Sequence, residues 1–202
     1  GENGGFSLSF ANTDNKSIVP NSELNRKTIN LGLSQNITDK LVASGNANYS
    51  HEANQNPPQV NAQDFSTATV IVTLANSMPF EALRNNITHP NGDEVVMARF
   101  LVRNNPYYST SKRFDNVKRD RLIGNVSLNY QFTPWLYAMG RLSMDFYVRD
   151  NDYNTPNGYA PIPPAPAGFV NGSFTQDTRR FRETNHDFLI GANRTFGNFN
   201  ID

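Results

Sequence analysis

Residues 120–149, DRLIGNVSLNYQFTPWLYAMGRLSMDFYVR, read as two long β-strands joined by a tight turn at Thr133-Pro134. Apolar and polar side chains alternate with a period of two on both sides of the turn, so one face of each strand is apolar and the other largely polar. The apolar face carries Leu122, Gly124, Val126, Leu128, Tyr130, Phe132, Leu136, Ala138, Gly140, Leu142, Met144, Phe146 and Val148. The pattern predicts an antiparallel hairpin.

The length of these two strands indicates a membrane rather than a soluble sandwich. A strand in a globular protein has about 5 or 6 residues, whereas a tilted strand needs about 9 to 11 to cross a bilayer. Aromatic residues gather at the turn, as Tyr130, Phe132 and Trp135, where an interfacial girdle would place them.

The same alternation recurs in residues 5–12, 28–36, 41–50 and 186–196, and Gly197-Asn198 predicts the turn of one more hairpin. The connections alternate between long ones, at 13–26, 51–119 and 150–184, and short ones, at 37–40, 133–134 and 197–198. Outer-membrane barrels have long extracellular loops and short periplasmic turns. We therefore expect an all-β fold: a segment of an antiparallel transmembrane β-barrel with about six strands and its long loops outside.

Composition limits the function classes. The chain of 202 residues has 18 basic and 18 acidic side chains, which gives no sign of a nucleic-acid partner, and it has no cysteine. No apolar run reaches the length of a membrane helix. Six strands are too few for a closed barrel, and an open sheet edge cannot lie in lipid. We therefore expect the chain to be a fragment, with further strands supplied by residues outside it or by other chains.

The 51–119 connection contains two candidate helices. Asp64 and Ser66 are capping residues in front of residues 67–76, whereas the β-branched run in residues 69–73 disfavours a helix there. Pro79 is placed to open a second helical turn, PFEALRN. For the 64–86 segment, both helix and loop remain open.

Polar residues on the two central strands are the expected lumen wall. They are Asn125, Asn129, Arg141 and Asp145. Arg141 and Asp145 share a face and are expected to interact, either as a substrate or plug contact or, with more weight, as a solvated charge pair of the wall. The three histidines are far apart, so no metal site or other cofactor is expected, and no catalytic motif supports an enzyme.

Loop aromatics are the candidates for contact with a sugar or peptide, because an aromatic face offers apolar area at low entropic cost. They are Tyr107, Tyr108, Tyr153, Tyr159 and Phe169. An equally weighted alternative is that these rings pack the long loops against each other or against a partner protein.

The first 52 residues resemble the early barrel segment of SusC/RagA-type TonB-dependent outer-membrane transporters. The likeness lies in the order and spacing of five short motifs, and it extends less sharply through residues 120–196. These motifs are the Phe6-to-Phe10 strand, the loop Ile18-Val19-Pro20-Asn21-Ser22 with Leu24-Asn25-Arg26 behind it, Ile29-Asn30-Leu31, Thr38-Asp39-Lys40-Leu41 and Asn48-Tyr49-Ser50.

The resemblance implies import of an oligosaccharide or peptide across the bacterial outer membrane, together with a SusD-like surface lipoprotein and powered by the TonB complex. It implies that residues 1–202 are part of a single barrel domain in contact with outer-membrane lipid, and that the plug domain and the TonB-contacting segment lie outside this sequence. The 64–86 loop resembles the family's extracellular loop that packs near the lipoprotein.

A second hypothesis is a soluble all-β ligand-binding or adhesion module whose long loops form the recognition surface. That module would need its apolar faces packed against each other in a dry core. An outer-membrane enzyme is the third possibility, and no residue constellation supports it.

Overall fold

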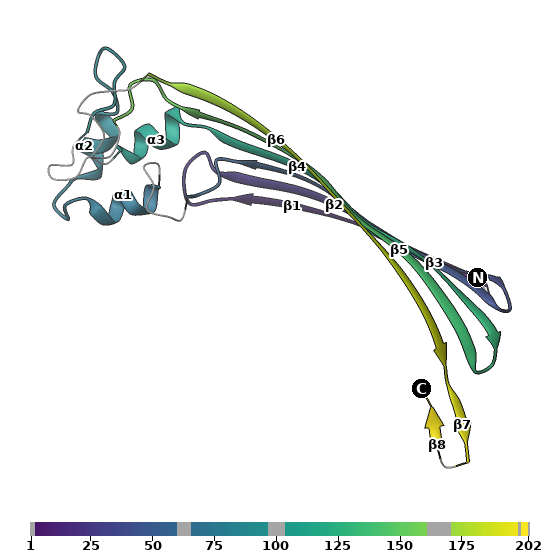
Figure 1. Ribbon diagram of the computed structural model, residues 1–202. Helices are drawn as coiled ribbons and strands as arrows, with labels where there is room; N and C mark the ends of the chain where they lie inside the picture. Colours follow the sequence, from purple (N-terminus) through teal and green to yellow (C-terminus); the bar gives the residue numbers. More distant parts are fainter. Residues whose placement is uncertain (1–2, 60–65, 97–103, 161–170, 198, 202) are drawn as a thin grey trace.

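The computed structural model of the chain describes residues 3–59, 66–96, 104–160, 171–197 and 199–201. Its six long strands pair in sequence order into one antiparallel sheet. They are β1 (Gly4–Lys16), β2 (Glu23–Thr38), β3 (Leu41–Gln55), β4 (Asp115–Thr133), β5 (Leu136–Thr155) and β6 (Ser173–Ala192). The sheet is long, twisted and curved, with the helices at one end and both chain termini at the other (Figure 1).

The predicted all-β class is confirmed, since the chain is mostly this antiparallel sheet. Each strand hydrogen-bonds only to its neighbours in sequence, so β1 and β6 are the two edges. Within the described residues the sheet is open and does not close into a barrel.

The strand register keeps residues of one kind on one face. Leu8 pairs with Leu31, Leu31 with Ala47, and Gly124 with Met144, so the apolar alternations of neighbouring strands coincide. The resulting apolar face comprises Phe6, Leu8, Phe10, Ile29, Leu31, Leu33, Leu41, Ala43, Ala47, Tyr49, Leu122, Val126, Leu128, Tyr130, Leu142, Met144, Phe146, Phe188 and Ile190. We call the opposite side, with Ser9, Asn30, Asn48, Asn125 and their neighbours, the polar face.

Nothing in the described residues covers the apolar face. Phe6 is 80% exposed and Phe188 is 75% exposed. The apolar side chains that are buried lie instead in the connections at the helical end: Val70, Leu83, Tyr108 and Ala160. The sheet therefore has no dry core of its own on this face.

Two of the predicted short turns are each closed by hydrogen bonds to a threonine side chain. Thr38 Oγ1 accepts hydrogen bonds from the backbone N–H groups of Lys40 and Leu41, at 3.2 and 3.0 Å. Thr133 Oγ1 accepts one from the backbone N–H of Leu136 at 3.1 Å. The register of each hairpin shifts by one residue beside its threonine. Both predicted turns are confirmed, and a threonine side chain holds each one closed.

The strands run further toward the helical end than the alternation predicted. The clearest correction is β6, which begins at Ser173, whereas residues 150–184 were expected to be a long connection. Residues 173–185 carry polar side chains on both faces, so they give no period-two signal, and pairing with β5 keeps them extended. Likewise β1 continues to Lys16 and β2 begins at Glu23, so the long connection expected at 13–26 is only residues 17–22. Strand β3 continues to Gln55 and β4 begins at Asp115.

Three short helices lie in the connection between β3 and β4: α1 (Thr67–Thr73), α2 (Phe80–Asn85) and α3 (Pro106–Lys112). The first two confirm the helical alternative for residues 64–86. Ser66 caps α1 by accepting from the backbone N–H of Thr69 at 3.3 Å, and Pro79 precedes α2. Asp64, the other candidate cap, lies outside the described residues. Helix α3 was not predicted, although Asn105-Pro106 is a recognisable helix start.

A small hairpin follows β6. Strand β7 (Arg194–Phe196) pairs with β8 (Phe199–Ile201), and Gly197 in the turn has a positive φ of 61°. This confirms the predicted new hairpin; Asn198 itself lies outside the described residues. No helix among the described residues has the length and apolar character of a membrane span.

Two glycines of the apolar face provide a test of the register. A Cβ added at Gly124 would lie 2.6 Å from the backbone oxygen of Asn46, whereas a Cβ at Gly140 would meet nothing within 4 Å. Gly124→Ala is expected to lower the free energy of unfolding by about 1 to 3 kcal/mol. Gly140→Ala is expected to change it little or to raise it by up to about 1 kcal/mol. Denaturant titration of both variants measures this, and equal losses would contradict the β3–β4 register.

Candidate functional site

The polar face of the sheet is the first component of the candidate site. Asn125 and Asn129 of β4 and Arg141 and Asp145 of β5, the four residues predicted for a lumen wall, all lie on this face. Asn125 Nδ2 donates to Asn46 Oδ1 at 3.1 Å, and Ser44 and Ser127 hydroxyls are 2.8 Å apart. Cross-strand hydrogen bonds between side chains therefore order the polar face.

The expected interaction between Arg141 and Asp145 is wrong. Arg141 Nε donates instead to Asp187 Oδ2 on β6 at 2.8 Å, and Arg121 Nη2 on β4 donates to Asp145 Oδ2 at 2.6 Å. Four residues of strand span about 13 Å, which is too far for a direct contact within β5. Cross-strand neighbours are much closer, and they take the charges.

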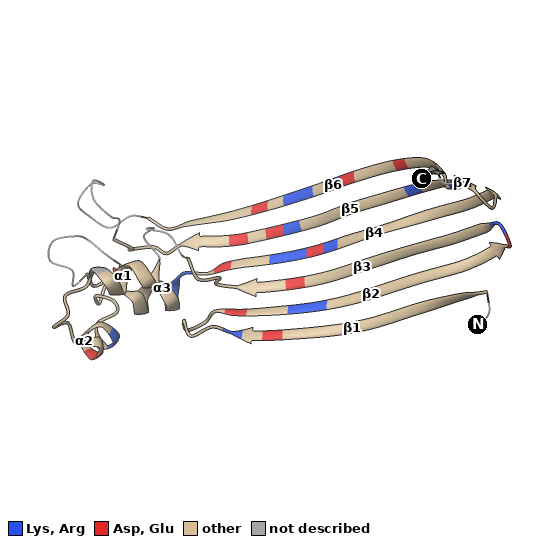
Figure 2. Cartoon of the chain, turned by 90° about the horizontal axis from the view of Figure 1, so that it is seen from below, with Lys and Arg blue, Asp and Glu red and all other residues tan. Residues whose placement is uncertain are grey.

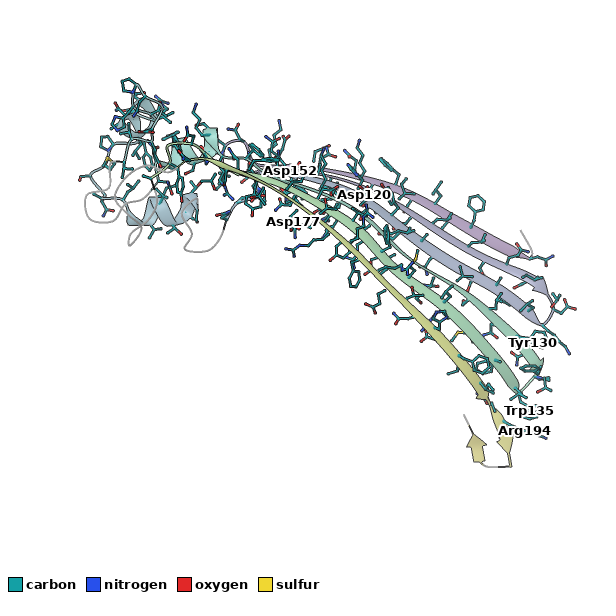
Figure 3. All side chains as sticks on the ribbon, turned by 45° about the horizontal axis from the view of Figure 1, so that its top comes forward. Asp120, Tyr130, Trp135, Asp152, Asp177 and Arg194 are labelled. Carbon is teal, nitrogen blue, oxygen red and sulfur yellow. The ribbon has the colours of Figure 1, made fainter. Side chains whose placement is uncertain are left out.

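Charges are concentrated in the half of the sheet near the helices. Figure 2 shows most of the Lys, Arg, Asp and Glu positions of the strands in that half, while the half near the short turns has few. Arg26 and Arg119 both bind Glu52 Oε2 there, at 2.5 and 3.2 Å. Figure 3 likewise places Asp120, Asp152 and Asp177 toward the helices and Tyr130, Trp135 and Arg194 at the turn end.

A stacked aromatic pair lies within this charged half of the polar face. The rings of Tyr147 on β5 and Phe181 on β6 have centroids 5.2 Å apart and an interplanar angle of 20°. Tyr147 is directly opposite Arg121 of β4. Neither ring was predicted to be part of a site, because the two lie on different strands and only the pairing of β5 with β6 brings them together.

The second component is the layer at the helical end, which we call the loop cap: the described residues of 56–59, 66–96, 104–114 and 156–160. Its centre is Glu94, which is fully buried. Glu94 Oε2 accepts from Asn104 Nδ2 at 2.8 Å and from the backbone N–H of Ala160 at 2.9 Å, and Oε1 accepts from the backbone N–H of Asn105. One carboxylate therefore joins the β3–β4 connection to the β5–β6 connection.

Asn105 extends this network to helix α2. Its side-chain oxygen accepts from the backbone N–H of Tyr107 and caps α3, while its Nδ2 donates to the backbone oxygens of Leu83 and Asn86, at 2.9 and 3.1 Å. Asn105 is itself buried. The hydrogen bonds of Asn105 thus fix α2 and α3 relative to each other, although Asn104 Oδ1 and Ser109 Oγ are buried in the loop cap without a partner among the described residues.

The predicted loop aromatics do not form one surface. Tyr108 is 1% exposed and its hydroxyl donates to the backbone oxygen of Asn157 at 2.8 Å, so it packs inside the loop cap, which agrees with the packing alternative for this ring. Tyr153 lies in strand β5 rather than in a loop. Tyr107 and Tyr159 are half-buried in the loop cap, and Phe169 lies outside the described residues.

An apolar recess lies on the outside of the loop cap, beside Tyr107. It has a volume of about 220 Å³ and is open to solvent. Ile18 and Pro20 of the β1–β2 connection form one side, and Ile71 of α1 and Phe80 of α2 form another. The predicted aromatic Tyr107 thus lines this recess.

The sheet and its two faces define the class of structure: an open antiparallel sheet with an uncovered apolar face, a hydrogen-bonded polar face and a helical layer at one end. No model of a known protein family matches the chain, and no curated protein sequence matches it. Across the described residues, no three His, Cys, Asp or Glu side chains are placed to hold a metal ion.

Glu94 is expected to control the stability of the loop cap. In Glu94→Gln one oxygen becomes an NH₂ group that faces N–H donors, which is expected to destabilise the loop cap locally by about 3 kcal/mol. Amide hydrogen exchange at Asn105 and Ala160 should then be roughly a hundredfold faster. Glu81→Gln, at an exposed position of α2, is the matched control and should leave both amides unchanged. Unchanged exchange in Glu94→Gln would contradict the assigned network.

Tyr108 gives the loop cap a dependence on high pH. Burial, and then the negative charges of Glu94 and Asp93, raise the pKa of Tyr108 from 10.0 to about 12. The unfolded chain loses the phenol proton first, so this contribution to stability is complete below pH 10 and is lost as the pH rises toward 12. A titration of phenolate absorbance should show one late tyrosine that Tyr108→Phe removes. If Tyr108→Phe instead removes a tyrosine that titrates near pH 10, the burial of Tyr108 is contradicted.

Proposed function

We propose that this chain is a segment of an outer-membrane β-barrel transporter of the TonB-dependent type, with its apolar face against lipid and its polar face lining the lumen. The uncovered apolar face is the observation that carries the proposal. Its side chains are those that a lipid bilayer would contact, while the side chains of the opposite face are hydrogen-bonded to each other.

The dimensions of the uncharged part of the sheet fit a bilayer. Residues 4–13, 28–38, 41–50 and 122–133 contain no Asp, Glu, Lys or Arg. Each stretch has about the 9 to 11 residues with which a tilted strand crosses the hydrocarbon core. Strands β5 and β6 do carry charges at the same level. Arg141, Asp145, Glu183 and Asp187 are on the polar face, and Arg182 is on the apolar face.

Both ends of the apolar face have side chains suited to a membrane interface. At the turn end, the rings of Tyr130 and Phe132 meet edge to face at 4.9 Å, and the guanidinium of Arg194 lies 5.2 Å from the ring centre of Trp135. At the other end, Tyr49 Oη donates to Asp120 Oδ1 at 2.6 Å, where the apolar rows give way to charged ones. Amphipathic aromatic side chains of this kind prefer the interface.

Strand β6 departs from this pattern. Arg182, Thr184 and His186 occupy the apolar-face positions opposite Phe146, Met144 and Leu142. Only Phe188, Ile190 and Ala192 continue the apolar face on β6. Under the proposal, the first half of this edge strand faces protein rather than lipid, because charged and polar groups in the hydrocarbon core are costly.

The soluble-module hypothesis has less support. It requires an apolar layer packed on the apolar face, and no described residue supplies one.

The transporter proposal gives the two ends of the sheet distinct roles. The short turns would lie on the periplasmic side, and the loop cap with its apolar recess would lie outside, where a SusD-like lipoprotein would dock. Further strands are needed to close the barrel.

The transported ligand and the energy source follow from the same proposal. An oligosaccharide or peptide would pass along the polar face, and TonB would act through a plug outside these residues. No described residue takes a catalytic role in this process.

A pair of arginine substitutions tests which face meets lipid. Leu128→Arg places a charge on the apolar face and is expected to reduce the free energy of unfolding in lipid vesicles by about 2 to 4 kcal/mol. Asn129→Arg, the next residue on the opposite face, is the matched control and is expected to change it by less than about 1 kcal/mol. The full-length protein would be unfolded by denaturant in vesicles. If the two variants lose stability equally, or Leu128→Arg loses none, the lipid-facing assignment fails.

A further inference from the structure

Three arginines stand side by side on the polar face. Arg119 of β4 pairs directly with Arg149 of β5, which pairs directly with Arg179 of β6. Figure 2 shows basic positions on β4, β5 and β6 in the half of the sheet near the helices. Side chains at directly paired positions have Cβ atoms about 5 Å apart, and like charges there destabilise a sheet. We call these residues the arginine ladder.

Neighbouring carboxylates neutralise the arginine ladder only in part. Glu52 binds Arg119 but also binds Arg26, and Asp177 Oδ2 accepts from Arg179 Nε at 2.9 Å. In the described ranges no carboxylate forms an ion pair with Arg149, the middle arginine. Arg119 Nε is buried and has no hydrogen-bond partner there. The ladder therefore retains positive charge and N–H donors for an added anion.

The stacked aromatic pair adjoins the ladder on the same face. Tyr147 is two residues from Arg149 on β5, and Phe181 is two residues from Arg179 on β6, so all four side chains point to the same side of the sheet. Phe181 is 39% exposed. The rings offer a flat apolar surface within reach of a group bound to the arginines.

We infer that the arginine ladder and the Tyr147–Phe181 pair form a binding subsite for an acidic oligosaccharide. Carboxylate or sulfate groups of the sugar bind the guanidinium groups, whose paired N–H donors match such anions. A sugar ring packs its apolar C–H face on the aromatic pair. The inference rests on the proposed function and specifies its substrate class. An acidic peptide would satisfy the arginines but gives no role to the adjoining rings.

Binding of chosen probes to the full-length protein in detergent tests this subsite. Tetragalacturonate supplies carboxylates, its fully methyl-esterified form is the uncharged control, and a sulfated tetrasaccharide tests the second anionic group. Hexaglutamate represents an acidic peptide. Calorimetric titration is expected to show binding of the acidic sugars that weakens as salt is raised, with at least tenfold weaker binding of the ester and of hexaglutamate. Equal binding of acidic and esterified sugar by the unaltered protein overturns the inference, and equal binding of hexaglutamate overturns the assignment to a sugar.

Variants separate a ligand site from a structural role. Arg149→Gln is expected to weaken binding of tetragalacturonate about tenfold or more, and Phe181→Leu to weaken it several-fold. Lys118→Gln, on the opposite face next to Arg119, is the matched control and should leave binding unchanged. Without ligand, Arg149→Gln should raise Tm, because it relieves repulsion between like charges. A lower Tm, or unchanged affinity in Arg149→Gln, overturns the ladder as a ligand site.

Uptake by cells distinguishes failure of this inference from failure of the proposed function. If outer-membrane vesicles contain the protein and cells import the esterified probe as well as the acid, the transporter proposal stands and the acidic subsite is overturned. If the protein does not fractionate with the outer membrane, the transporter proposal itself fails and the subsite inference falls with it.

Discussion

The register of the six-stranded sheet is the constraint on which both of its faces depend. Because side chains alternate with a period of two, a slip of one residue between any two strands would move apolar residues to the polar face and interrupt both surfaces. Two threonine-closed turns hold the register at one end of the sheet. Along the strands, cross-strand contacts between polar side chains reinforce it, as in the pairs Arg121–Asp145 and Arg141–Asp187. The side chains of the polar face thus help to fix the strand register, in addition to being compatible with water.

The helical end is stabilised differently. There the backbone leaves regular strand pairing, and its polar groups are buried, so they need partners that the sheet does not provide. Glu94 and Asn105 supply these partners for segments that are far apart in sequence, including Leu83 in α2 and Ala160 after β5. A carboxylate inside a protein is costly unless hydrogen bonds surround it. The stability of the loop cap therefore depends on a small number of side chains, whereas the stability of the sheet is spread over many cross-strand residue pairs.

The sequence was informative where one face of a strand is apolar and the other polar. Residues 120–149 showed both strands and their turn, and the helix starts at Ser66 and Pro79 were visible as capping signals. The beginning of β6 was missed because residues near Arg179 are polar on both faces, so only pairing with β5 defines them as a strand. The partners and burial of individual side chains in the folded chain could not be predicted from the sequence either. Whether Tyr108 is buried, and whether Arg141 meets Asp145 or Asp187, depends on strands and loops that are distant in sequence.

The long connection between β3 and β4 has a consequence for the order of folding. The hairpins β1–β2, β2–β3 and β4–β5 are closed by short connections and bring together residues that are near in sequence, so they can form quickly. Pairing of β3 with β4 must instead close a loop that contains three helices, and its entropic cost rises only slowly with loop length. Hydrogen bonds of Glu94 and Asn105 within that connection hold part of it in place, so fewer of its residues remain to be ordered when the two strands pair. We therefore expect the pairing of β3 with β4 to form more slowly than these three hairpins.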